Sequence, residues 1–323
     1  PVAYIAMPKS PQASETISLV VFFAAFSGLL MSAFMKVMFF SKNFEMANDT
    51  ISKLESLFDE MDKNKLAHGD VSDMTSHDID FSGVTFRYEE GVDVLTDFNL
   101  KLESGKKYAL VGSSGSGKST IAKLISGFYP VSSGELKIGG VDISKYKRET
   151  LEHEIAFVFQ NAKLFKTSIY ENVKIGRPDA SREEVIKALD LAMCGSILDK
   201  FETREDTIIG AKGVHLSGGE TQRIAIARAI LKDAPIIILD EASAASDPEN
   251  EYEMQQAFSK LMEGKTVIMI AHRLSSIRNV DEILVVEDGK VTERGSHDEL
   301  MKKDSKYKNL QNLYNQANEW RLS

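Results

Sequence analysis

The 323-residue sequence contains only one cysteine, Cys194, so no internal disulfide can form. No group of cysteines and histidines has the spacing of a metal site. Basic charge is not in excess either: the formal net charge is -9, which argues against a nucleic-acid-binding protein. A 43% hydrophobic content still allows a sizeable core, and the cysteine usage fits a cytosolic location for the soluble part. The sequence starts at Pro1 without a methionine, and we expect it to be a fragment of a longer polypeptide.

Charged residues are absent between Thr16 and Met35. This length suits a helix that crosses the ~30 Å hydrocarbon core of a bilayer. A buried core helix and a signal peptide are the alternatives, but a signal peptide has a basic start and ends in small residues. Here Lys9 is the only basic residue before the run, whereas Lys36 and Lys42 follow it. We therefore predict a membrane span whose C-terminal side is cytoplasmic.

After the predicted span, residues 41–66 are expected to continue as a helix, because apolar residues recur at helical spacing. These residues are Phe44, Ile51, Leu54, Phe58 and Met61. The polar run that follows Gly69 is typical of a linker. We thus predict three parts: a membrane segment with its cytoplasmic extension (1–68), a linker (69–78) and a folded domain with a C-terminal helical tail (79–323).

From about Ile79 the pattern changes to strands. FSGVTFRY and VLTDFNLKL alternate as strands of a half-solvated sheet do. KKYALVG, PIIILD and TVIMIAH are short apolar runs typical of strands buried on both faces of a parallel sheet. Helical patterns such as REEVIKALDLAM lie between them. The predicted fold class is α/β, with an antiparallel β subdomain at the start and a helical subdomain.

A glycine-rich motif of the form G-x-x-x-x-G-K-[ST] lies between the strand pattern YALV and the helix pattern STIAKLI, the context expected of a P-loop. Glycines allow backbone N–H groups to surround phosphate oxygens at the positive end of a helix. Lys118 is predicted to neutralise the β and γ phosphates, and the Ser119 hydroxyl to ligate Mg²⁺. The motif comprises Gly112, Ser113, Ser114, Gly115, Ser116, Gly117, Lys118, Ser119 and Thr120.

Two carboxylates, Asp240 and Glu241, close the apolar run IIIL. Asp240 is placed to hold Mg²⁺ through its water shell. Glu241 is a candidate general base that polarises the attacking water. A solvated acidic pair at a strand end is the alternative, and the upstream P-loop disfavours it.

The segment Leu216-Ser217-Gly218-Gly219-Glu220 precedes the helix pattern TQRIAIARAIL. Serine and glycines at a helix N-terminus can bind an anion. The same residues also fit a capping box, with Ser217 as N-cap and Glu220 three residues later. Both interpretations can hold together.

The P-loop, LSGGE and ILDE motifs, in this order, resemble the nucleotide-binding domain of ABC transporters over roughly residues 77–300. The resemblance implies ATP and Mg²⁺ as cofactors. It also implies that Tyr88 stacks on adenine and that Gln160 senses Mg²⁺ and the membrane domain. Asp247 resembles the aspartate that couples two ATP sites, and His272 resembles the switch histidine that contacts the γ-phosphate.

A membrane helix followed by a cytoplasmic helix and this domain resembles the end of an exporter-fold half-transporter, which normally has six spans. The resemblance implies a second half-transporter, identical or homologous, with two ATP molecules, each sandwiched between one P-loop and the LSGGE segment of the partner, which is the family signature. It further implies five other membrane helices, a lipid bilayer, a location in the cell inner membrane with the ATPase domain in the cytoplasm, and no nucleic-acid partner. The transported substrate stays open.

Three positions depart from the family pattern. Glu220 stands where glutamine is commoner, and the segment with Asp247 reads AASD rather than SALD. Ala211 stands where exporters usually have a glutamate that faces the membrane domain, so the usual contact there is in doubt. LSGGE and DPENE together resemble a bacterial branch that includes siderophore importers, so the direction of transport also stays open.

Two other functions compete with a transport ATPase. A soluble ABC ATPase of DNA repair or translation is disfavoured by the predicted span and by the modest distance from Ser119 to Ser217. A catalytically inactive partner in a heterodimer is disfavoured by the presence of both Glu241 and His272, because degenerate sites usually lose one of them.

Overall fold

The computed structural model describes residues 11–63, 65–88, 91–210, 214–241, 248–271 and 277–322. It divides into two compact units, Pro1–Asn64 and Lys65–Ser323.

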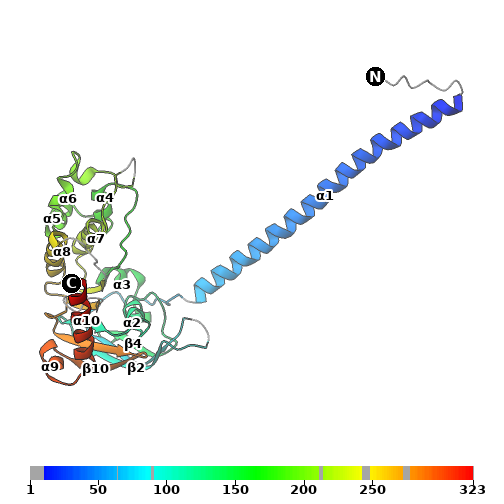
Figure 1. Cartoon of the computed structure of the whole chain (residues 1–323). Helices are drawn as coiled ribbons and strands as arrows, with labels where there is room; N and C mark the ends of the chain where they lie inside the picture. Colours follow the sequence, from blue (N-terminus) through cyan, green and yellow to red (C-terminus); the bar gives the residue numbers. More distant parts are fainter. Residues whose placement is uncertain are drawn as a thin grey trace. The chain divides into compact units, whose positions relative to one another are not determined.

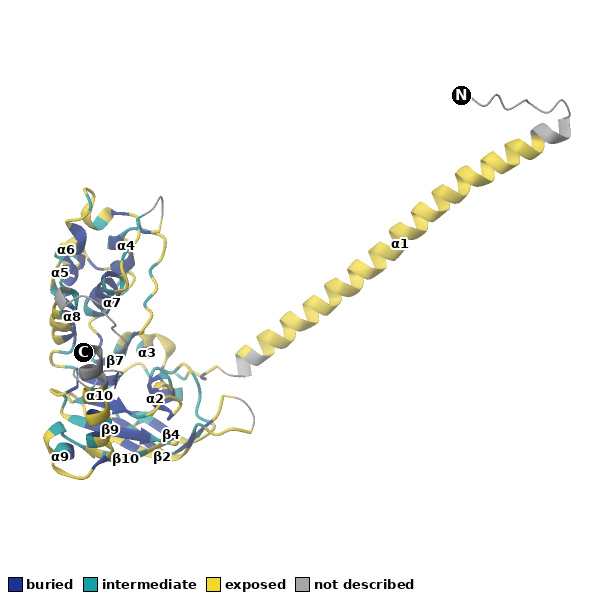
Figure 2. Ribbon diagram, viewed as in Figure 1, coloured by how far each residue is buried: buried dark blue, intermediate teal, exposed yellow. Residues whose placement is uncertain are grey.

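The described part of the first unit is one long helix, α1 (Pro11–Lys63, 53 residues). It includes the predicted span and most of the predicted helical continuation. Its stretch Glu15–Asp59 has a window of mean hydropathy 2.2 and is long and apolar enough to cross a membrane, by length and composition. The side chains described on α1 are exposed, as Figure 2 shows, and Leu29 is 70% exposed. Apolar surface of this extent is typical of a face that contacts lipid or protein.

The second unit starts with a four-stranded antiparallel sheet in the order β2-β1-β4-β5. Side chains of β1 and β2 alternate between buried and more exposed positions, so one face packs on the core. This confirms the predicted antiparallel subdomain. The strands are β1 (Ile79–Phe86), β2 (Leu95–Leu102), β4 (Ser133–Ile138) and β5 (Val141–Asp142).

A six-stranded sheet in the order β10-β9-β3-β8-β7-β6 forms the centre of the domain. Its neighbours pair in parallel, except for the edge strand β10, which is antiparallel to β9. The apolar runs of β7 and β8 are buried on both faces, as predicted. The strands are β3 (Lys107–Val111), β6 (Ile155–Val158), β7 (Ile236–Glu241), β8 (Thr266–Ala271), β9 (Glu282–Glu287) and β10 (Lys290–Gly295).

Two cores use opposite faces of this sheet. Ile236 and Ile238 of β7 pack into the core shared with the antiparallel sheet. Ile237 and Leu239 pack into a second core with the helices. In Figure 1, α4 to α8 gather into one group apart from the strands, which is the predicted helical subdomain. The helices are α2 (Lys118–Ile125), α3 (Arg148–Glu154), α4 (Ile169–Lys174), α5 (Arg182–Leu191), α6 (Gly195–Leu198), α7 (Gly218–Lys232), α8 (Pro248–Leu261), α9 (His297–Lys302) and α10 (Lys306–Leu322).

The segment before β1 follows the surface of the domain. Leu66 is 4% exposed and joins the core shared by the two sheets. The Gly69 N–H donates to the Tyr146 carbonyl at 3.1 Å, and Val71 forms an isolated parallel bridge with Tyr146. Residues at the start of the predicted linker are therefore fixed to the second unit by backbone hydrogen bonds.

Candidate nucleotide-binding site

The predicted chemical groups follow neighbouring strands of the central sheet. β3, β8, β7 and β6 are adjacent and parallel, so their carboxyl ends lie along one edge. The P-loop follows β3, Asp240 and Glu241 end β7, and Gln160 comes two residues after β6. The carboxyl edge of an open α/β sheet is where ligands bind. The topology thus brings the P-loop and the end of β7 to the same edge, although they are more than 100 residues apart in the sequence.

Two glycines of the P-loop are required by the backbone. Gly112 has φ 145°, and a Cβ there would lie 2.1 Å from the Val286 carbonyl oxygen. Gly117 has φ 104° and is the N-cap of α2, without a side-chain capping hydrogen bond. The first N–H groups of a helix have no partner within the helix. At α2 they therefore remain available to an anion, which the helix dipole also favours.

The side chain of Lys118 folds back onto the backbone of the P-loop. Its ammonium donates to the carbonyls of Gly112 at 2.9 Å and Ser113 at 2.6 Å, and to the Ser116 hydroxyl at 3.2 Å. Lys118 is 7% exposed. Burial lowers the pKa of its ammonium, and the nearby Asp240 carboxylate only partly opposes this shift. The loop thus holds a desolvated cation at its centre.

The other P-loop side chains divide by exposure. Ser116 and Thr120 are buried, at 4% and 5% exposure. Ser113, Ser114, Gly115 and Ser119 are exposed. The Ser119 hydroxyl, predicted to ligate Mg²⁺, is therefore accessible at the first turn of α2.

Gln160 and Asp240 line one cavity of about 890 Å³. Gln160 is exposed and Asp240 is partly buried. The cavity also has aromatic walls and two half-buried basic side chains, Arg228 and Lys232, whose pKa values burial lowers. The sequence predicted Gln160 and Asp240 at this place but not the basic wall behind them.

Tyr88 lies beside the P-loop helix. Its hydroxyl is 3.2 Å from the Thr120 hydroxyl oxygen, and the ring is 40% exposed. Phe86 and Tyr129 meet the ring edge-to-face, with centroids 4.8 and 5.2 Å away. The Lys123 ammonium lies 5.5 Å from the centroid. A partly exposed aromatic ring is thus fixed next to the predicted phosphate site, while stacking on adenine stays a prediction.

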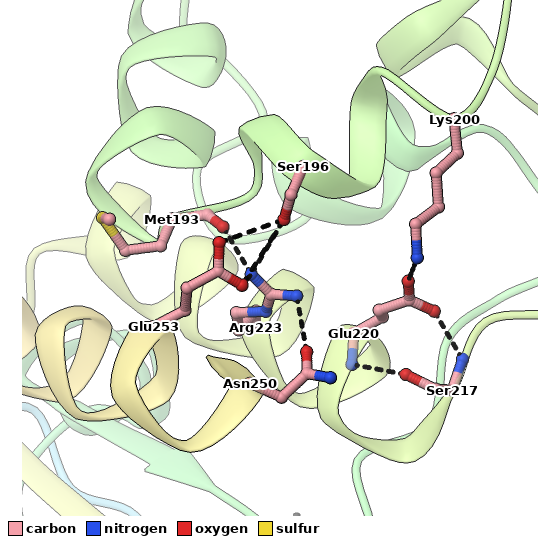
Figure 3. A network of polar contacts seen from close by, with 8 residues as sticks. All are labelled: Met193, Ser196, Lys200, Ser217, Glu220, Arg223, Asn250 and Glu253. Atoms are coloured by element: carbon pink, nitrogen blue, oxygen red, sulfur yellow. Dashed lines mark hydrogen bonds and ion pairs between the residues drawn. The ribbon is translucent and has the colours of Figure 1, made fainter. Parts of the chain in front are cut away.

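The LSGGE segment forms the predicted capping box at the start of α7. The Glu220 N–H donates to the Ser217 hydroxyl at 3.2 Å, and the Ser217 N–H donates to the Glu220 carboxylate at 2.6 Å. Lys200 forms an ion pair with the other carboxylate oxygen (Figure 3). Gly218 and Gly219 provide the first two N–H groups of the helix.

Three predicted positions lie outside the described residues, and a fourth is described only in its backbone. Asp247, His272 and Ala211 lie outside them. For Glu241 the backbone is described, as the last residue of β7, but the side chain is not. The predicted roles of these residues stay predictions.

A buried polar cluster behind the LSGGE turn was not predicted. The Arg223 guanidinium on α7, 2% exposed, forms an ion pair with Glu253 and donates to Asn250 Oδ1 at 3.0 Å and to the Met193 carbonyl at 2.7 Å (Figure 3). Asn250 and Glu253 belong to the first turns of α8. The cluster therefore fixes α8 to the helix that LSGGE starts.

Known proteins are similar to this chain in sequence. Residues 95–244 match the family described as ABC transporter. The chain is 44% identical over 238 residues to YgaD of Bacillus subtilis, which is named for multidrug export. It is 45% identical over 245 residues to the ATP-dependent lipid A-core flippase of Salmonella paratyphi A. These matches cover 73% and 75% of this chain.

The matched residues form an ABC transporter nucleotide-binding domain. The solved structure of a bacterial Atm1-family ABC exporter with ATP bound is similar to this chain at a TM-score of 0.71 and 34% identity, over 81% of this chain and 46% of that one. The predicted ABC fold, preceded by a long apolar helix, is confirmed. The chain spans 41% and 42% of the length of the two named relatives.

Proposed function

We propose that this chain binds Mg-ATP at the P-loop edge of the ABC domain and hydrolyses it, and that hydrolysis drives transport of a substrate across a membrane. The central observation is the convergence of strand ends. The P-loop after β3 and the acidic end of β7 lie on one sheet edge. The Asp240 carboxylate is close enough to Lys118 to oppose, in part, the lowering of its pKa by burial. A cation that is already desolvated by the loop binds phosphate oxygens strongly.

Catalysis needs a base and charge stabilisation at this edge. Lys118 and the N–H groups at the start of α2 stabilise negative charge on the β and γ phosphates. Glu241, next in the chain to Asp240, is the proposed base for the attacking water. The proposal also keeps His272 as a γ-phosphate contact, and Asp247 as a link between two ATP sites.

The donor set fits a magnesium ion. Hydroxyl, carboxylate and amide oxygens are the hard donors that Mg²⁺ prefers, and Mg²⁺ usually keeps waters and binds substrate phosphates. Ser119 is exposed at the first turn of α2, and Gln160 and Asp240 share a cavity, so the chain offers one hydroxyl, one carboxylate and one amide oxygen as the proposed ligands. When bound, Mg²⁺ neutralises charge that develops on the phosphates.

A second copy or homologue completes the proposed site. Glycine in a helical turn costs about 0.5–1 kcal/mol relative to alanine. Yet among the described residues a Cβ at Gly218 meets nothing within 4 Å, and one at Gly219 meets only Asn250 at about van der Waals distance. Packing among the described residues therefore does not require these glycines. A ligand that approaches their N–H groups from outside does, and we propose that it is the ATP held by the partner's P-loop.

Transport is inferred from the combination of this domain with α1. The apolar surface of α1 suits lipid and further membrane helices, and we propose a bacterial inner-membrane location with the ABC domain in the cytoplasm. The relatives carry names for different cargo, multidrug export and lipid A-core, at 44% and 45% identity. Such similar identities do not select a substrate, so the proposal stops at ATP-driven transport.

Mg-ATP hydrolysis by the full chain in lipid nanodiscs tests the function. Lys118→Ala should abolish measurable turnover. Glu241→Gln keeps shape but removes the basic oxygen, and turnover should fall by about 10²–10⁴-fold while ATP still binds. Lys106→Ala, an exposed lysine outside the P-loop, is the control. A Lys118→Ala variant that hydrolyses ATP as fast as the wild-type chain contradicts the P-loop assignment. A wild-type chain that binds ATP but does not hydrolyse it favours the inactive-partner function.

A further inference from the structure

The LSGGE turn of this chain, called the signature turn below, contains a negatively charged side chain. Glu220 is 6% exposed and lies at the third position of α7, in the same turn as the N–H groups proposed to meet ATP. Burial alone raises the pKa of its carboxyl. The ion pair with Lys200 and the hydrogen bonds from Ser217 outweigh burial, and the pKa ends below its ordinary value. Glu220 is therefore ionised at neutral pH.

An ionised carboxylate has two opposite effects here. It stabilises the helix, because negative charge is favourable near a helix N-terminus. It also repels a triphosphate brought to the same N–H groups, since like charges at close range oppose each other. A glutamine at this position can accept the same capping hydrogen bond without the charge.

Lys200 is placed to neutralise the Glu220 charge and so to reduce its repulsion of the triphosphate. It comes from the turn after α6 and forms an ion pair with Glu220 Oε1, while Oε2 accepts from the Ser217 N–H (Figure 3). The buried guanidinium of Arg223 forms an ion pair with Glu253 and donates a hydrogen bond to Asn250. Among the described residues, Lys200 is the cation that contacts Glu220.

We propose that Lys200 is a charge-compensating, positioning residue that makes a glutamate signature compatible with ATP. It neutralises Glu220 and holds its carboxylate in the capping position, so the turn presents Gly218 and Gly219 N–H groups without net repulsion. This inference rests on the proposed ATP function. It predicts that Lys200 matters only while residue 220 is charged.

A double-mutant comparison tests this dependence. The full chain in nanodiscs is assayed for kcat and KM of Mg-ATP hydrolysis as wild type, Lys200→Met, Glu220→Gln and the double variant. Lys200→Met should raise KM roughly fivefold, the size expected for one uncompensated charge near a phosphate in a partly screened site. Lys200→Met in the Glu220→Gln background should change KM less than about twofold, because no charge is left to compensate.

Two controls separate charge from structure. Lys200→Arg keeps the charge and should restore the wild-type KM. Lys187→Met removes an exposed lysine of the same helical subdomain and should leave KM unchanged. An equal rise in KM in both backgrounds, or no rise in an active wild-type background, overturns the inference and leaves the proposed function intact. A wild-type chain without ATP turnover overturns the proposed function and the inference with it.

Discussion

Arg223 of α7 and Glu253 of α8 form an ion pair in which the guanidinium is almost fully buried, with 2% of the side chain exposed against 19% for the carboxylate. The pair joins the helix that begins at Ser217 to the helix that begins at Pro248. α8 follows the segment after Glu241, so the pair holds the signature helix against the helix beyond the proposed base. The charge pair thus lies between two elements of the proposed ATP mechanism.

Removal of Arg223 should destabilise the domain. Arg223→Met leaves the Glu253 charge without its partner, and breaking one side of a buried pair costs about 3–5 kcal/mol. Denaturant unfolding followed by circular dichroism measures the loss. Arg148→Ala removes an exposed i,i+4 partner of Glu152 and should have no measurable effect.

The double variant Arg223→Met/Glu253→Leu makes this prediction specific. Apolar residues of similar volume often replace a buried ion pair without loss. The double variant should therefore recover most of the stability that Arg223→Met loses. A double variant that is no more stable than the single one contradicts the ion-pair explanation.

Tyr88 provides a test of the base-binding side of the site. Tyr88→Ala should weaken ATP binding by about 1–3 kcal/mol if adenine stacks on the ring. Tyr88→Phe keeps the ring and loses only the contact with the Thr120 hydroxyl, so its affinity should stay close to wild type. Isothermal titration with Mg-ATP compares the two variants. Equal losses would show that the hydroxyl, not the ring, is the important group.

The central sheet could be predicted because its signals are local. The apolar runs at Ile236–Glu241 and Thr266–Ala271 are short and uninterrupted, and each became a buried parallel strand. The capping box from Ser217 to Glu220 could be predicted for the same reason, since both partners lie within four residues. Local spacing and side-chain chemistry together determine such features.

The polar contacts behind the signature could not be predicted in this way. Arg223 and Glu253 are 30 residues apart, and Lys200 and Glu220 are 20 apart. A charged residue in a helical pattern is usually solvent-exposed, so nothing in the sequence marks Arg223 as buried. Only the packing of α6, α7 and α8 brings these groups together.

The apolar half of α1 should be required for membrane insertion. Leu29→Arg with Leu30→Arg places two charges in the predicted span, each at a cost of about 2.5–3.5 kcal/mol on insertion scales. The variant should be extracted from membranes by alkaline carbonate, whereas wild type should not. Ala47→Arg with Asn48→Arg places the same charges in α1 after the predicted span, and this variant should remain in the membrane. Carbonate-resistant association of the Leu29/Leu30 variant contradicts a span at Thr16–Met35.

Cys194 offers a probe of the cluster around Arg223. Its side chain is buried in the helical core, next in the chain to Met193, whose carbonyl accepts from Arg223. Burial raises the pKa of the thiol to about 12, so almost no thiolate forms at pH 8. The unfolded chain loses this proton near the ordinary value of 9.0, so the thiol's contribution to stability is lost as the pH rises above 9.

An aromatic disulfide reagent at pH 8 should therefore leave the native chain unmodified and label one thiol per chain in denaturant. Arg223→Met should accelerate native-state labelling, because loss of the guanidinium frees the turn at Met193 and promotes local opening. Arg148→Ala should label as slowly as wild type, and Cys194→Ala should show no labelling. Fast, stoichiometric labelling of the native wild-type chain would contradict the burial of Cys194. Equal labelling rates in Arg223→Met and wild type would show that Arg223 does not hold this turn closed.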